Sequence, residues 1–145
     1  DIVDTIYHTP QKFENQELEY PVIVALRELA LEQIRKEKYP AYPSRMSCLY
    51  VSETLEEAKK WEEYFISLGR PAFGIVKLQI TGNKFVGDST KCFYATVNKE
   101  ENLKLAELYW ENAGDTVGKS GIKEILVDGE IEVLELINWE VIENV

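Results

Sequence analysis

The sequence predicts an α+β fold, and three observations lead to this class. Strand-like and helical segments alternate in the first half of the chain, whereas the second half consists mostly of strand-like segments with one helix. No internal repeat or low-complexity tract interrupts this order. At 145 residues, 45% of them hydrophobic and 29% charged, the chain is long enough to bury a core. We therefore expect one domain spanning residues 1–145.

The N-terminal third is expected to hold a strand, a helix and an ordered loop. The strand covers residues 5–8, and the Thr-Pro pair that follows ends it, because a residue before proline avoids the helical region. Pro21 suits the first position of a helix, and the apolar positions predict that this helix covers residues 22–38 and packs against a sheet. Two Tyr-Pro pairs within residues 39–43 end it and indicate an ordered loop.

A second strand and helix are expected next. Residues 46–52 have strand character. Thr54 and Glu57 have the spacing of a capping box, in which a hydroxyl and a carboxylate bind free amides at the helix start. Apolar side chains then recur at helical spacing up to residue 68, and Gly69 is placed to end the helix.

The remainder of the chain is expected to be mainly strands. Gly-Asn at 82–83 predicts a turn, and Asp-Gly at 128–129 predicts a hairpin turn after which the last strand continues the sheet. The expected elements are strands at 72–80, 92–97, 122–127 and 131–137, and a helix at 103–112 whose Leu103, Leu105, Ala106, Tyr109 and Trp110 form a wide apolar surface.

The charge balance excludes some classes of partner. The net charge is −10, which argues against binding to nucleic acid or to an anionic membrane surface, since both reward clustered Lys and Arg. Cys48 and Cys92 lie far apart without a paired framework, which favours a reducing compartment. With no leader peptide and no apolar run of spanning length, a cytoplasmic location is expected.

Two kinds of site are not supported by the residue pattern. One His and two distant Cys cannot form a zinc cage, and the acidic residues lack the spacing of a calcium loop, so no metal is expected. The segment 114–120 resembles a phosphate-binding P-loop, but it has three residues instead of four between its glycines. A helix also precedes it and a strand follows, which is the reverse of the P-loop context.

Three side chains stand out as candidates, although each also has a structural explanation. His8, the only histidine, ends the first expected strand, and Tyr50 lies near the end of the second. Either residue taken alone is more often a structural one than a catalytic one. Glu124 shares a strand face with Ile122 and Leu126. A carboxylate between two aliphatic side chains is costly to bury unless another group pairs with it, and a partly solvated strand face is the alternative.

Taken in order, these motifs resemble the ADP-ribosyltransferase superfamily of the His-Tyr-Glu type, which includes diphtheria-toxin-like and poly(ADP-ribose) polymerase-like domains. The first motif is Ile6-Tyr7-His8-Thr9, the second is Leu49-Tyr50-Val51-Ser52 with its following helix, and the third is Glu124-Ile125-Leu126-Val127 with a turn and a last strand. The resemblance covers nearly the whole chain. It implies a split β-sheet core with flanking helices, as in small bacterial and phage relatives of this fold.

The resemblance also implies roles for individual residues. NAD+ would be the substrate, with ADP-ribose passed to a macromolecule or to water. His8 would hold the adenosine-side ribose and the backbone at Thr9 the nicotinamide amide, while Tyr50 would stack on the nicotinamide ring. Glu124 would be the catalytic residue, stabilising the positive charge that develops at the anomeric carbon. Arg45 and Ser47 would contact the diphosphate or a ribose, with a simple surface charge as the alternative for Arg45.

The departures from the family pattern leave other functions open. Many relatives have Gly after the histidine, whereas Thr9 and a proline follow here. Arginine-modifying members carry Gln or Glu two residues before the catalytic Glu, and Ile122 stands there, so the resemblance disfavours arginine as the acceptor. The acidic composition favours a protein or small-molecule acceptor. The alternatives are a catalytically inactive binding module of the same fold and an unrelated α+β interaction domain.

Overall fold

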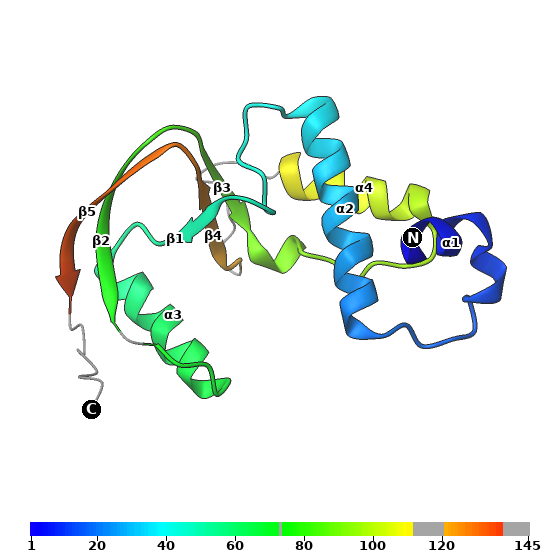
Figure 1. The fold of residues 1–145 in the computed structure, drawn as a ribbon, viewed down its shortest axis with the longest axis horizontal. Helices are drawn as coiled ribbons and strands as arrows, with labels where there is room; N and C mark the ends of the chain where they lie inside the picture. The colour runs from blue at the N-terminus through cyan, green and yellow to red at the C-terminus, as the bar shows by residue number, and fades with distance from the viewer. Residues whose placement is uncertain (73, 112–120, 138–145) are drawn as a thin grey trace.

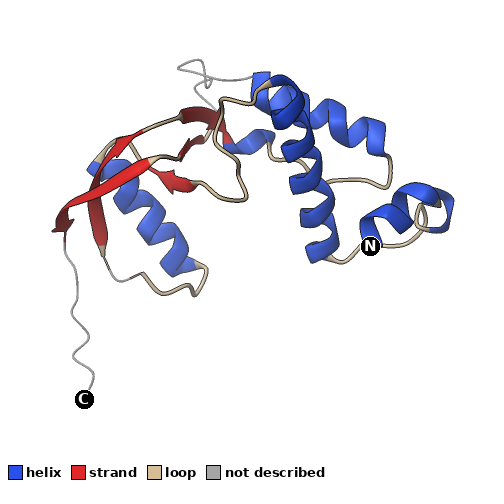
Figure 2. Ribbon diagram, turned by 45° about the horizontal axis from the view of Figure 1, so that its top comes forward, coloured by secondary structure: helices blue, strands red, loops and turns tan. Residues whose placement is uncertain are grey.

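The computed structural model describes residues 1–72, 74–111 and 121–137, and within them the chain has the α+β fold that the sequence predicts. A three-stranded and a two-stranded antiparallel sheet occupy one part of the molecule, and the helices α1, α2 and α4 occupy the other (Figures 1 and 2). The helix α3 lies beside the two-stranded sheet. The helices are α1 Ile2–His8, α2 Tyr20–Lys38, α3 Leu55–Ser67 and α4 Lys99–Glu111. The strands are β1 Leu49–Val51, β2 Ile75–Thr81, β3 Lys84–Asp88, β4 Lys123–Val127 and β5 Glu130–Ile137.

The main core lies between the long helices and the three-stranded sheet. Apolar side chains of α2 and α4 face each other and pack against β3 and β4. At the centre, the Trp110 ring meets Phe85 with ring centroids 4.7 Å apart, and its Nε1 donates a hydrogen bond of 2.9 Å to Leu31 O. The buried members of this core are Ala30, Leu31, Ile34, Phe85, Ala106, Tyr109, Trp110 and Leu126.

The N-terminal segment is a helix, so the strand predicted over residues 5–8 is wrong. The Asp1 side chain caps α1 by accepting a hydrogen bond from Val3 N. Val3 and Ile6, three residues apart, are both buried in a second core that includes Leu26 of α2. Helical spacing of these two side chains therefore overrides the strand preference of the Thr-Ile-Tyr sequence. The chain leaves the helix at Thr9, as its position before proline requires.

The strand predicted over residues 92–97 is also wrong, because a side chain takes the place of a neighbouring strand. Thr96 N donates to Asn102 Oδ1 at 2.8 Å, and Asn102 Nδ2 donates back to Thr96 O at 2.7 Å. The same amide nitrogen donates to Tyr7 OH at 3.0 Å, so the fully buried Asn102 side chain joins this segment to α1. Residues 92–97 thus run as irregular chain between the two cores.

The Asp-Gly pair at 128–129 does not form the predicted hairpin, because it connects strands of two different sheets. One sheet has the order β1-β4-β3 and the other the order β2-β5, so β4 and β5 do not pair with each other. The chain passes between the sheets at two adjacent bends, at residues 82–83 and 128–129, where Asp128 N donates to Asn83 O at 3.1 Å. A Cβ atom at Gly82 would lie 2.0 Å from Asp128 O, and one at Gly129 would lie 2.4 Å from Thr81 O. Only glycine permits the two bends to approach so closely.

The other predicted elements are confirmed with shifted ends. The helices expected at 22–38, 55–68 and 103–112 correspond to α2, α3 and α4, although residue 112 lies outside the described residues. Thr54 accepts a hydrogen bond from Glu57 N as the capping box predicts. The β1 strand is shorter than the expected 46–52, and β3 is an element that the sequence analysis did not assign. Glu53 connects β3 and β4, since Lys84 of β3 and Lys123 of β4 both donate to its carboxylate. These two contacts lower the pKa of Glu53 to about 2.

Candidate functional site

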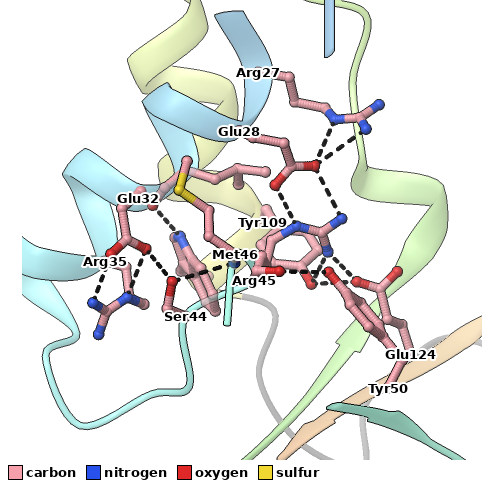
Figure 3. A network of polar contacts seen from close by, with 12 residues as sticks. Arg27, Glu28, Glu32, Arg35, Ser44, Arg45, Met46, Tyr50, Tyr109 and Glu124 are labelled. Carbon is pink, nitrogen blue, oxygen red and sulfur yellow. Dashed lines mark hydrogen bonds and ion pairs between the residues drawn. The ribbon is translucent and has the colours of Figure 1, made fainter. Parts of the chain in front are cut away.

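Arg45 lies at the centre of a polar cluster between the helices and the three-stranded sheet (Figure 3). We call this group the Arg45 cluster. Its members are Glu28 of α2, Arg45 of the segment between α2 and β1, Tyr50 of β1, Tyr109 of α4 and Glu124 of β4. The Arg45 side chain is only 9% exposed. A guanidinium at this depth requires compensating partners, and every nitrogen that can donate has one.

The loop before β1 holds Arg45 in this position. The Arg35 guanidinium donates to Tyr42 O at 3.0 Å and to Pro40 O at 3.3 Å, which ties the loop to the end of α2. The Tyr42 ring stacks on the Tyr39 ring with centroids 5.5 Å apart and also contacts the core. The ordered loop that the two Tyr-Pro pairs predict is therefore confirmed, and it presents Arg45 to β4 from a fixed backbone.

Arg45 connects acidic groups of two different elements. Its Nε donates to Glu28 Oε2 at 2.9 Å and its Nη2 to Glu28 Oε1 at 3.2 Å, a bidentate pair. Its Nη1 donates to Tyr109 OH at 2.8 Å and to Glu124 Oε1. Arg27 also pairs with Glu28 at 3.1 Å, so two carboxylates and two guanidinium groups balance in charge.

Glu124 projects from β4 toward the helices, on the face that the strand alternation predicts. Its side chain is 13% exposed, and Tyr109 OH donates to Oε1 at 2.7 Å in addition to the Arg45 ion pair. Within the part of the chain that the structure describes, no hydrogen bond reaches Oε2. Glu124 is therefore a paired carboxylate that keeps one oxygen available as an acceptor.

Tyr50 lies on the same face as Glu124. In the antiparallel β1–β4 pair Tyr50 is opposite Leu126, two residues from Glu124, and side chains two apart share a face. The Arg45 guanidinium lies 5.6 Å from the Tyr50 ring centroid, and Tyr50 OH donates to Arg45 O at 3.3 Å. Because Tyr50 is 51% exposed, one side of the cluster opens to solvent at this ring.

Burial determines the protonation of the neutral groups around Arg45. It raises the pKa of the Tyr109 and Tyr50 phenols, and it raises the pKa of the Cys92 thiol to about 11. For Arg45, burial lowers the pKa, but Tyr109, Glu28 and Glu124 raise it more, and the net shift is upward. The cluster thus holds a permanent cation and protonated phenols at neutral pH, and the Cys92 thiol has no thiolate character.

Of the predicted site residues, the structure brings together Arg45, Tyr50 and Glu124 but not His8 and Thr9. His8 is exposed on α1, where its Nδ1 lies 2.7 Å from Asp4 O, and Thr9 Oγ1 donates to Thr5 O at 2.9 Å. Both views place α2 between α1 and the three-stranded sheet (Figures 1 and 2). His8 and Thr9 therefore bind within their own helix, on a helix instead of the predicted strand.

Ser47 lies near the cluster in sequence and is exposed on the loop. Its backbone N donates to Ser44 O at 3.1 Å in the turn that precedes β1. The segment 114–120, which contains the P-loop-like motif, lies outside the described residues.

Two members of the cluster were not predicted as site residues. Tyr109 was expected only as part of an apolar helix surface, and its ring is indeed buried while its hydroxyl binds Glu124. Glu28 is absent from the predicted site residues, although Glu28, Glu32 and Arg35 follow one another at helical spacing beside the apolar face of α2. A charged row of this kind next to buried positions is the signal that identifies Glu28.

The described surface has shallow hollows away from the Arg45 cluster. One of about 170 Å³ is lined by residues at the start of α4, and another of about 190 Å³ is lined by β2 and β5. No group of three or more His, Cys, Asp or Glu side chains among residues 1–72, 74–111 and 121–137 could hold a metal ion. None of the described helices has both the length and the apolar composition needed to cross a membrane.

One protein family matches most of the chain. The match covers residues 5–140, and the family is described as "Protein of unknown function (DUF2441)". No curated protein matches the chain.

Proposed function

Because the chain belongs to the DUF2441 family, whose description assigns no activity, we propose its function from the site: binding of NAD+ at the Arg45 cluster and transfer of ADP-ribose to a macromolecular acceptor or to water. The observation that carries this proposal is the contact of a carboxylate, a guanidinium and a half-exposed phenol on one sheet face. A carboxylate can stabilise charge on the ribose, an aromatic ring can stack on the nicotinamide, and a guanidinium can bind a diphosphate.

In the proposed reaction, Glu124 acts on the nicotinamide ribose. The bond between the ribose C1′ and the nicotinamide nitrogen breaks, nicotinamide leaves as a neutral ring, and the acceptor forms the new bond at C1′ and gives up a proton. Positive charge develops on the ribose in between, and a nearby carboxylate stabilises it. The acceptor oxygen Oε2 of Glu124 is available for a ribose hydroxyl, and the exposed side of Tyr50 is available for the nicotinamide ring.

The proposal requires a change in the partners of Arg45. Each of its three donor nitrogens binds Glu28, Glu124 or Tyr109, so a diphosphate must replace at least one of these contacts to reach the guanidinium. Glu28 is the exchangeable partner, since Arg27 also neutralises it. His8 lies on α1, so the roles that the resemblance implies for His8 and Thr9 require α1 to move and are not part of the proposed site.

A catalytically inactive binding module of the same fold is the second candidate. Arg45 and Glu124 already satisfy each other, which is the arrangement of a structural ion pair. In that case the Arg45 cluster joins α2, α4 and β4, and ligand binding at Tyr50 leads to no release of nicotinamide. The free thiols of Cys48 and Cys92 support a reducing, cytoplasmic location for either function.

The test uses Glu124→Gln, which keeps the shape of the side chain and removes its charge. Wild-type protein is incubated with NAD+ labelled in the ADP-ribose and in the nicotinamide, with and without a cell lysate. We expect nicotinamide release by the wild type and a loss of about 100-fold or more in the variant, because the transition-state charge loses its counter-charge.

Glu14→Gln is the matched control, since Glu14 is exposed on the segment between α1 and α2. It should release nicotinamide at the wild-type rate. Circular dichroism checks that both variants are folded. Equal release by wild type and Glu124→Gln removes Glu124 from the mechanism, and binding of NAD+ without release by the wild type supports the inactive module.

A further inference from the structure

The β2–β5 sheet carries a second surface, distinct from the Arg45 cluster. This sheet lies at the end of the molecule opposite α1 (Figures 1 and 2). Within residues 1–72, 74–111 and 121–137, β5 pairs with β2 along one edge and with no strand along the other. An open strand edge presents a row of backbone donors and acceptors that a further strand can bind.

The β5 sequence protects this edge only in part. Proteins commonly guard an open edge with proline, with charged side chains, most often lysine, or with a bulge. Residues 130–137 contain neither proline nor lysine. The β2–β5 pairing has one irregularity, because Lys77 pairs with Glu135 whereas Leu78 pairs with Val133. Residues 130–133 pair regularly with β2.

One face of the sheet is apolar and only half covered. Val76, Leu78 and Ile80 of β2 share this face, and their partners Leu136, Val133 and Ile131 of β5 lie opposite them. The β2 side chains are half-buried, and α3 lies beside this sheet (Figure 1), whereas Val133 is 59% and Leu136 56% exposed. The apolar half contributed by β5 therefore has room for further apolar side chains.

The opposite face of the same strand is acidic. Glu130, Glu132 and Glu135 lie there, opposite Thr81, Gln79 and Lys77. A hollow of about 190 Å³ is lined by Gln79, Thr81, Glu130, Ile131 and Glu132. A strand added to β5 would place every second side chain beside these glutamates and the others beside Ile131 and Val133.

The charges on this face determine which occupant fits. A second copy of β5 paired antiparallel would bring two sets of three glutamates onto one face, and like charges on paired strands repel each other. A polyanion such as nucleic acid is repelled in the same way. We propose that the β5 edge binds an extended segment of a partner protein in which Lys or Arg alternates with β-branched apolar residues.

The probe for this inference is a fluorescent peptide of alternating Lys and Val, blocked at both ends. We expect it to bind the wild-type protein and to slow hydrogen exchange in residues 130–137, because the added strand protects the free amides of the edge. A scrambled peptide with its lysines in one block and its valines in another should bind much more weakly. A peptide of alternating Glu and Val should not bind.

Charge reversal on the protein gives the matched comparison. The double variant Glu130→Lys, Glu132→Lys should bind the Lys-Val peptide about tenfold more weakly, because two cross-strand pairs change from attractive to repulsive. Glu14→Lys, Glu17→Lys makes the same charge change at exposed positions beyond α1 and should bind as the wild type does. Circular dichroism establishes that both variants are folded.

Four outcomes overturn the inference. The first is that the wild type does not bind the Lys-Val peptide, and the second is that the scrambled peptide binds equally well. The third is that both double variants weaken binding alike. The fourth is sedimentation of the free protein as a dimer in which residues 130–137 are already protected, which assigns the edge to a second copy. None of these readouts depends on NAD+, so the inference and the proposed function can fail separately.

Discussion

Arg45→Met is expected to lower the free energy of unfolding by about 3 kcal/mol, because it leaves the Glu124 carboxylate buried without its cation. Methionine fills much of the volume of the arginine side chain, so the loss reports on charge more than on packing. Glu28 keeps its ion pair with Arg27 and contributes less to the loss. Urea unfolding followed by circular dichroism measures the change.

The control is Arg70→Met, an exposed arginine next to the Phe65 ring. It should change the free energy of unfolding by no more than about 0.5 kcal/mol. Adding Glu124→Gln to Arg45→Met should restore part of the lost stability, because a neutral amide is easier to leave buried than a carboxylate. A double variant less stable than Arg45→Met alone would contradict the ion pair as the cause.

Trp110→Ala is expected to lower the free energy of unfolding by about 4 kcal/mol. The ring is fully buried between α2, α4 and the three-stranded sheet, where it contacts Phe85 and Tyr109. Its removal leaves a cavity and also leaves Leu31 O without the indole donor. Thermal and urea unfolding measure this loss.

Trp61→Ala gives the matched comparison, since Trp61 is half-buried on α3 and stacks on Phe65 with centroids 5.8 Å apart. It should cost about 1 to 2 kcal/mol. If the two tryptophan variants lose equal stability, the assignment of the main core to the region between α2, α4 and the three-stranded sheet is wrong.

The sequence predicted those elements whose signals are local. The α3 helix has its Thr54 cap and its apolar spacing within one short segment, and both are confirmed. The pairing of Glu124 could be anticipated as well, because a carboxylate on an apolar strand face requires a partner. Which partner it has could not, since Arg45 and Glu124 are 79 residues apart and meet only where β1 pairs with β4.

The wrong predictions arose where groups outside the segment in question decide its backbone conformation. Residues 92–97 have strand propensity, but Asn102 binds both backbone groups of Thr96. The bend at 128–129 has a hairpin sequence, but its close contact with Gly82 directs β5 to the other sheet. Residues 5–8 read as a strand because the cap at Asp1 and the buried Val3 lie outside that window. The site role of His8 follows from the resemblance, whose first motif takes residues 6–9 as the end of that strand.

The proposed function rests on Tyr50 and Glu124 facing one ligand, and calorimetric titration with NAD+ tests this most directly. The account predicts that the wild type binds NAD+, that Tyr50→Ala binds it about fivefold to tenfold more weakly through loss of ring stacking, and that Tyr94→Ala, at an exposed tyrosine elsewhere, binds it unchanged. No binding by the wild type at about 1 mM NAD+, or equal affinities of wild type and Tyr50→Ala, would contradict it.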